Sequence, residues 1–281
     1  MTAGMQDTSI SKTLRLSDRD LDFLVETGAP EVRDKARLKE IIRQDEDFRN
    51  TFIGDEKVCR QVMGDDEIFL RISPTLFFEI LLRKAAKDLG RVGYTLEKTS
   101  TIKVPVFDTE EVVKLLAKEA ILTYLADMLS SFTKVESYSI SFRGKKRIWK
   151  KIRFNDLDIH SLMSFCEVVE DEYRFAFYKR IADVCLFILG IFPEYVERDY
   201  RYPFSRQVRP QIRGRLRISP ENYEKEGRKF YKLAAEHLSA RKLNLSEVFW
   251  TLHGDFQKAR KPLNFIAEHY LRYQRQNIFW L

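Results

Sequence analysis

Hydrophobic residues recur at intervals of three and four along most of the chain, with charged residues between them. This spacing places the apolar side chains on one face of an α-helix, so each such segment is predicted to be a helix with a buried stripe. The predicted helical segments are 17–28, 30–42, two short pieces ending near 54 and 64, 73–90, 108–132, 155–168 and several helices within 219–275. Asp108 is expected to cap one long helix that ends near Phe132. The pattern predicts a mainly helical protein, built as a multi-helix bundle.

The segment 172–192 loses its polar face in its second half. From Ile181 to Phe192 only Asp183 is charged, and Pro193 follows directly. A helix that is apolar all round must be covered by protein on every side, and this run is well short of the roughly 20 residues that cross a bilayer. We therefore expect 172–192 to be the buried central helix of the bundle, and we expect no membrane span.

The segment 135–154 alternates with a period of two instead. Aromatic and β-branched residues alternate with serines, and the turn sequence Arg-Gly-Lys-Lys follows them. We expect a β-hairpin here, with a three-residue loop that gathers the serines and several basic residues on one face. The residues grouped with the serines are Trp149, Lys151 and Arg153. A second segment, 94–107, contains Pro105 and is expected to be an extended connection or an edge strand.

These elements are expected to form one domain. Residues 1–16 lack a periodic pattern and are predicted to be a flexible arm, followed by a single helical domain at 17–281 in which 94–107 is a candidate subdivision. Residues 194–218 contain two prolines and little periodicity, which predicts a long loop. The apolar C-terminal residues 278–281 are expected to pack back onto the same chain.

Composition bounds the class of protein. Of the 281 residues, 44% are hydrophobic, which is enough for a sizeable core. The first residues are polar, with no apolar signal-peptide core, so we expect a cytoplasmic protein. Cys59, Cys166 and Cys185 lie far apart and form no Cys-x-x-Cys motif, which is typical of buried thiols in a reducing compartment.

The positive charge is concentrated in two segments. Residues 143–153 carry seven positive charges and no acid, and 198–217 carry seven arginines against Asp199 alone. Since these two segments exceed the net charge of +7, the remainder of the chain is acidic. Basic residues interleaved with aromatic ones suit contacts to phosphates and to stacked bases. The candidate polyanion-binding residues are Arg143, Lys145, Lys146, Arg147, Trp149, Lys150, Lys151, Arg201, Arg206, Arg209, Arg213, Arg215 and Arg217.

The basic segments have a second interpretation. The acidic body of the chain, or a second copy of it, would neutralise the arginines and hold the long loop down. In that case the protein is a scaffold or regulatory subunit, which contacts an acidic protein surface or its own copy through these segments and through the apolar C-terminus. We rank binding of nucleic acid or another polyanion first and this protein-binding alternative second.

Enzyme motifs are nearly absent from the sequence. There is no glycine-rich phosphate loop, no nucleophile elbow and no pair of histidines at helical spacing, so we expect no metal and no cofactor, and binding is favoured over catalysis. One pair remains. Arg153 and His160 resemble the Arg-x(4–6)-His signature of the HEPN ribonucleases, an all-helical family. The resemblance implies an RNA-cleaving site formed by these two residues, and it is our third hypothesis.

Three segments carry a further resemblance. These are 73–83 (SPTLFFEILLR), 186–194 (LFILGIFPE) and 227–231 (GRKFY). They resemble a group of uncharacterised bacterial all-helical proteins. The similar residues are of the type that forms a core, so the resemblance implies a shared fold and no activity.

Overall fold

The computed structural model of the chain describes residues 16–98, 103–133, 137–143, 149–155, 159–193, 219–272 and 274–279. It confirms that the protein is mainly helical. The elements are α1 (Asp18–Gly28), α2 (Lys35–Gln44), α3 (Glu46–Ile53), α4 (Glu56–Gly64), α5 (Ile68–Arg71), α6 (Pro74–Val92), β1 (Thr95–Lys98), β2 (Lys103–Val106), α7 (Thr109–Leu116), α8 (Glu119–Ser131), β3 (Ser137–Arg143), β4 (Trp149–Asn155), α9 (Ile159–Val168), α10 (Asp171–Ile191), α12 (Pro220–Glu236), α13 (Leu238–Lys242), α14 (Ser246–Gly254), α15 (Phe256–His269) and α16 (Arg275–Ile278).

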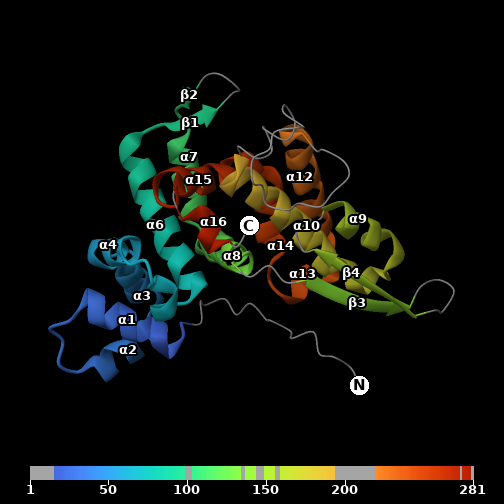
Figure 1. Ribbon diagram of the computed structural model, residues 1–281. Coiled ribbons are helices and arrows are strands. Elements are labelled where there is room, and N and C mark those ends of the chain that lie inside the picture. The colour runs from blue at the N-terminus through green and yellow to red at the C-terminus, as the bar shows by residue number, and fades with distance from the viewer. Residues whose placement is uncertain are drawn as a thin grey trace.

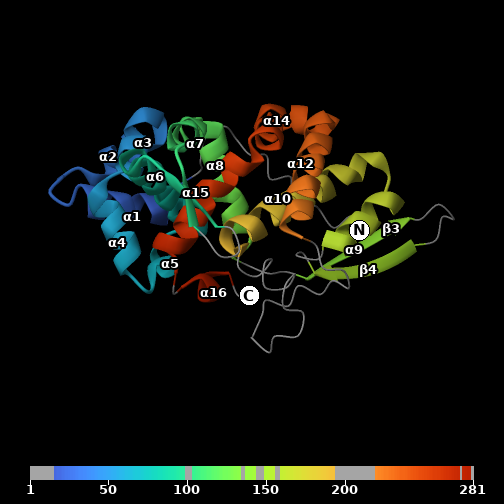
Figure 2. The ribbon, with the colours of Figure 1, turned by 90° about the horizontal axis from the view of Figure 1, so that it is seen from above.

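Helix α10 runs through the middle of the molecule, and α9, α12 and α15 pack against it (Figure 1). Helices α1–α4 form one end. After a quarter turn, α9 and the strands β3 and β4 lie at the opposite end (Figure 2). The helical body around α10 therefore separates the N-terminal helices from the β3–β4 hairpin. Within the described part of the chain, no helix combines the length and the apolar character needed to cross a membrane.

The second half of α10 is enclosed on all sides. Residues 181–191 are all buried, and glycines let the neighbouring helices come close. A Cβ atom added at Gly190 would lie 2.7 Å from Leu263 of α15. One added at Gly227 of α12 would lie 2.5 Å from Phe256. Both distances are too short for non-bonded carbon atoms, so this packing requires glycine at both positions.

The segment 108–132 forms two helices, α7 and α8, rather than the single helix expected. The last buried residues of α7 are Leu115 and Leu116, and helical spacing would next bury positions three or four residues further on. Helix α8 instead starts its buried stripe with Ile121 and Leu122. The chain bends between the helices because the two apolar stripes are out of phase.

Asp108 also differs from its expected role as a helix cap. Its side chain makes no capping hydrogen bond. The Thr95 hydroxyl donates to one carboxylate oxygen at 2.9 Å, and Lys261 forms an ion pair with the other. The carboxylate therefore links the start of β1 to α15.

Residues 94–107 contain a second hairpin, which corrects the expectation of only one. Strands β1 and β2 pair antiparallel, with Leu96 opposite Pro105. Proline has no amide hydrogen to donate, but each strand of a two-stranded sheet has an unpaired edge where none is needed. Strands of four residues show too little alternation for the pattern to reveal them.

The hairpin β3–β4 begins its pairing with Arg143 opposite Trp149. The expected register is therefore wrong, because it would have placed Arg143 opposite Arg147, and like charges directly opposite destabilise a strand pair. The loop itself falls in 144–148, which lies outside the described residues. The register shifts by two positions, which leaves each position on the same face of the hairpin.

The C-terminal residues Ile278 and Phe279 are buried in the core of their own chain, as expected. The Phe279 ring centroid lies 5.5 Å from that of Phe78 on α6 and 5.0 Å from that of Phe187 on α10. This end of the chain thus joins two of its central helices. Residues 280–281 lie outside the described ranges.

The N-terminal end begins with a capping box on α1. The Ser17 and Asp20 side chains each accept a hydrogen bond from the other residue's backbone amide. Leu16, assigned to the expected arm, packs against a small cluster of hydrophobic residues from α1 and α2. The rest of that arm, residues 1–15, lies outside the described ranges.

Candidate functional site

The register of β3 and β4 decides which of the predicted basic residues share a face. The directly opposed pairs at odd-numbered positions are Arg143–Trp149, Ser141–Lys151, Ser139–Arg153 and Ser137–Asn155. Those at even-numbered positions are Phe142–Lys150, Ile140–Ile152 and Tyr138–Phe154. Alternate positions of a strand lie on the same face, so one face of the hairpin carries polar and basic positions with one indole, and the other is mostly apolar. We call the positions 143, 149, 151 and 153 the hairpin face.

Lys150, also a candidate polyanion-binding residue, falls on the opposite face of the hairpin, as the expected grouping of Trp149, Lys151 and Arg153 with the serines implied. Lys145, Lys146 and Arg147 belong to the connection 144–148, outside the described residues. The predicted arginines between 201 and 217 also lie outside them. The candidate surface is therefore carried by the hairpin face.

The pair suggested by the HEPN resemblance occupies two different elements. Arg153 is on β4, and His160 is in the first turn of α9. The Nε2 atom of His160 is buried and has no hydrogen-bond partner in the described part of the chain. A general acid or base must be able to contact its substrate, so this buried nitrogen gives no support to a catalytic role.

Asp183, fully buried in α10, is the centre of a polar network. The hydroxyls of Tyr124 on α8 and Tyr231 on α12 donate to its Oδ1 at 2.6 and 2.9 Å, and the Lys179 Nζ lies 2.7 Å from its Oδ2. Burial, followed by the negative charge of Asp183, raises the pKa of both tyrosines well above the ordinary value, so they keep their protons and donate. Because both tyrosines are buried, the network joins three helices and is closed to a substrate.

The cysteines are poorly suited to nucleophilic chemistry. Burial raises the pKa of Cys59 and of Cys166 to about 11, and it raises the pKa of the fully buried Cys185 well above the ordinary value. Reactive cysteines require the thiolate, which these environments disfavour. Among the described residues there is also no group of three or more potential metal ligands.

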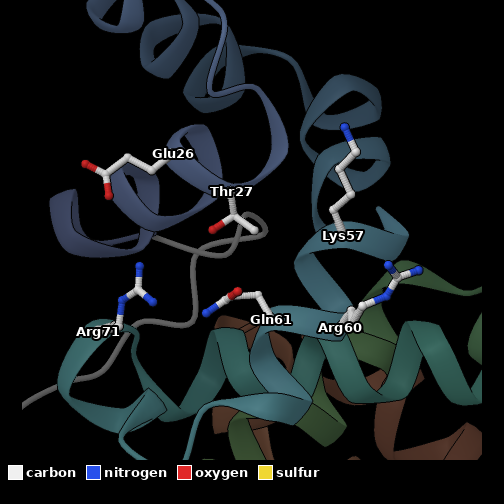
Figure 3. Close-up of a pocket in the computed structure, with 6 residues that line it drawn as sticks. All are labelled: Glu26, Thr27, Lys57, Arg60, Gln61 and Arg71. Carbon is white, nitrogen blue, oxygen red and sulfur yellow. The ribbon is translucent and has the colours of Figure 1, made fainter.

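A polar pocket lies at the other end of the molecule, between α1, α4 and α5. Its volume is about 540 Å³. Figure 3 shows Gln61 extending from α4 toward Arg71 and Thr27, while Lys57 and Arg60 project from the same helix. The residues that line the pocket are Glu26, Thr27, Lys57, Arg60, Gln61 and Arg71.

This pocket was not predicted from the sequence. Its residues are spread over 26–71, and each of them alone has the character of an ordinary surface residue. The one local signal is the spacing of Lys57 and Arg60, which lie three residues apart and hence on one face of α4. Their proximity to Arg71 depends on how α1, α4 and α5 pack.

Comparison of the chain with protein-family models, with curated proteins and with solved structures finds no match. The hairpin face and the pocket are therefore the two candidate binding sites of the described part of the chain.

Proposed function

We propose that this protein binds single-stranded nucleic acid through the hairpin face. The observation that carries the proposal is the register of β3 and β4. It puts three basic positions and one tryptophan on the same face, with serines as their neighbours. Shifting the register by one residue would have distributed these residues over both faces.

The chemistry of these residues fits the backbone and the bases of a single strand. Arginine and lysine contact phosphates and release counterions, which supplies affinity without sequence preference. An indole can stack on a base, and such stacking tolerates any base. The three serines add hydroxyl groups that can donate to phosphate oxygens.

The structure offers a matched pair of variants to test this proposal. Lys151→Glu changes a charge on the hairpin face, and Lys150→Glu makes the same change on the opposite face of the same strand. Binding of a fluorescein-labelled single-stranded RNA is measured by fluorescence anisotropy over a range of salt concentrations. We expect Lys151→Glu to weaken binding at least about tenfold and Lys150→Glu to weaken it less than about threefold. Equal effects of the two variants, or no binding by the wild type at low salt, would refute the proposal.

Trp149 provides an independent test, because stacking does not depend on salt. Trp149→Ala should weaken binding by about 1–3 kcal/mol without changing the salt dependence, and Trp149→Phe should keep most of the affinity. If Trp149→Ala binds as tightly as the wild type, stacking on the indole does not contribute to the proposed interface.

The scaffold alternative loses part of its basis in the structure. It relied on the apolar C-terminus as a surface for another protein, and Phe279 is buried against Phe78 and Phe187 of its own chain.

A further inference from the structure

We infer that the pocket between α1, α4 and α5 binds a small phosphate ester of about nucleotide size. The pocket lies at the end of the molecule opposite to the hairpin face (Figure 2), so this inference is independent of the proposed function. Three of its six lining residues are cationic, and one is acidic. The cations differ in how they are held and in whether they are already paired.

Arg71 is fixed at one side of the pocket. Its guanidinium lies 3.1 Å from Asp65 and 5.1 Å from the centre of the Phe23 ring. The chain on either side of it is tied to α1, because Arg19 donates to the carbonyl oxygens of Leu70 and Ile72. A cation held in this way needs little reordering when a ligand binds, which lowers the entropic cost of binding.

Lys57 and Arg60 are the cations without a protein partner. Neither side chain makes a hydrogen bond or an ion pair with any residue that the structure describes, and the same is true of Gln61. All three are exposed, and in Figure 3 Gln61 points toward Arg71 while Lys57 and Arg60 point away from it. The pocket therefore presents two unneutralised positive charges and an unused amide beside Arg71.

The C-terminal end of α1 does not account for these cations. Glu26 and Thr27 lie in the last turn of α1, where a helix carries a partial negative charge equivalent to roughly half an elementary charge. One neighbouring cation would compensate for that charge. With Asp65 assigned to Arg71, the charges of Lys57 and Arg60 exceed the combined charge of Glu26 and the helix end by about half an elementary charge.

The residue types indicate the ligand class. Arginine forks bind phosphate oxygens through two parallel hydrogen bonds, and lysine contributes a point charge. Glu26, Thr27 and Gln61 can accept from or donate to hydroxyl groups, such as those of a sugar. A volume of about 540 Å³ lies within the range typical of small-molecule sites. A phosphorylated sugar or a nucleotide combines these features.

The test uses the full chain and isothermal titration calorimetry at low salt. Adenosine monophosphate and ribose 5-phosphate are the probes, with adenosine and ribose as the matching compounds that lack phosphate. We expect saturable binding of at least one phosphate ester with one molecule per chain, and binding of its unphosphorylated counterpart at least about tenfold weaker. The inference fails if neither ester binds saturably, or if removal of the phosphate leaves the affinity unchanged.

Two double variants locate the site. Lys57→Glu combined with Arg60→Glu should weaken binding of the ester at least about tenfold, because two charge-assisted contacts are lost. Lys225→Glu combined with Arg241→Glu makes the same change in net charge at exposed positions on α12 and α13, and should leave the affinity within about threefold of the wild type. An equal loss in both double variants would show a general effect of charge and overturn the assignment.

Gln61→Leu separates a shaped site from a patch of charge, because it leaves the net charge unchanged. We expect it to weaken binding about three- to tenfold. Since Gln61 is exposed, the melting temperature should stay that of the wild type. Unchanged affinity in this variant would contradict the placement of the ligand between α4 and Arg71.

Discussion

Two of the buried carboxylates, those of Asp183 and Glu79, differ in how their oxygens are paired. Asp183, between α8, α10 and α12, accepts from two tyrosine hydroxyls on Oδ1 and pairs with Lys179 on Oδ2. Glu79, on α6, receives two hydrogen bonds from Arg83 on Oε1 alone. Its Oε2 is buried, with no partner in the described part of the chain.

This difference affects the charge of Glu79. Burial raises the pKa of Glu79 above its ordinary value of 4.5, although Arg83 opposes the shift. Arg83 is shared, because it also donates to Asn50 and Glu119 at 2.8 and 2.5 Å. A buried acid therefore stabilises the fold only to the extent that both of its oxygens are paired, and the two sites allow this rule to be tested within one protein.

The apolar packing beside Asp183 gives the largest effect. Phe187 is 1% exposed, and its ring centroid lies 4.0 Å from that of Phe132 in a stacked arrangement. Phe187→Ala should lower the free energy of unfolding by about 3–5 kcal/mol, measured by urea denaturation. Leu238→Ala, at a position that is 68% exposed, is the control and should cost under about 0.5 kcal/mol. A comparably small loss for Phe187→Ala would mean that α10 is not the centre of the core.

Removing the charge at the fully paired site should have the next largest effect. Asp183→Asn keeps the shape of the side chain but leaves Lys179 without its counter-ion, so we expect a loss of about 2–4 kcal/mol in urea denaturation. Asp171→Asn makes the same change at the exposed start of α10 and should cost under about 1 kcal/mol. If the two losses are equal, the paired carboxylate contributes no more than a surface acid.

The helical class could be predicted because its signals are local. The pairs Ser73-Pro74 and Ser219-Pro220 each indicate the start of a helix, and both serines cap their helices in the structure. The run from Ile181 to Phe192 carries its burial signal in its own composition, and α10 lies on that run. The bend between α7 and α8 is also encoded in the spacing of the apolar residues. The apolar stripe shifts by only two positions there, which is too small a change to distinguish two helices from one.

The sites could not be predicted to the same degree, because their residues are distant in sequence. Tyr124 and Tyr231 lie 59 and 48 residues from Asp183, so no spacing connects them. The pocket takes residues from three helices, and the packing of those helices places Lys57, Arg60 and Arg71 around one pocket. The hairpin face is the intermediate case. The alternation of serines is visible in sequence, while the register that sets Lys150 apart depends on the loop length.

A smaller effect is expected from one hydrogen bond of the Asp183 network. Tyr124→Phe removes the hydroxyl that donates to Oδ1 at 2.6 Å and leaves the ring in place, so it should cost about 1–2 kcal/mol. A double-mutant cycle with Asp183→Asn, again by urea denaturation, isolates the interaction. The cost of Tyr124→Phe should shrink in the Asp183→Asn background, and an unchanged cost would show that the hydroxyl stabilises the fold through another group.

The smallest effect, and the one whose sign depends on pH, is expected at Glu79. Well below pH 4.5 its carboxyl is protonated in the folded and the unfolded chain alike, so it contributes no pH dependence there. As the pH rises above 4.5, the unfolded chain releases its proton while the folded chain retains it, because burial raises the pKa of Glu79 in the folded state. The stability contributed by this group is therefore lost as the pH rises through the folded-state pKa. Glu79→Gln cannot titrate, so its stability relative to the wild type should increase as the pH rises above 4.5, measured by urea denaturation over a series of pH values. Asp171→Asn should show no such trend, and a wild type that instead gains stability over Glu79→Gln with rising pH would show that Arg83 alone is sufficient to hold the ionised carboxylate in the core.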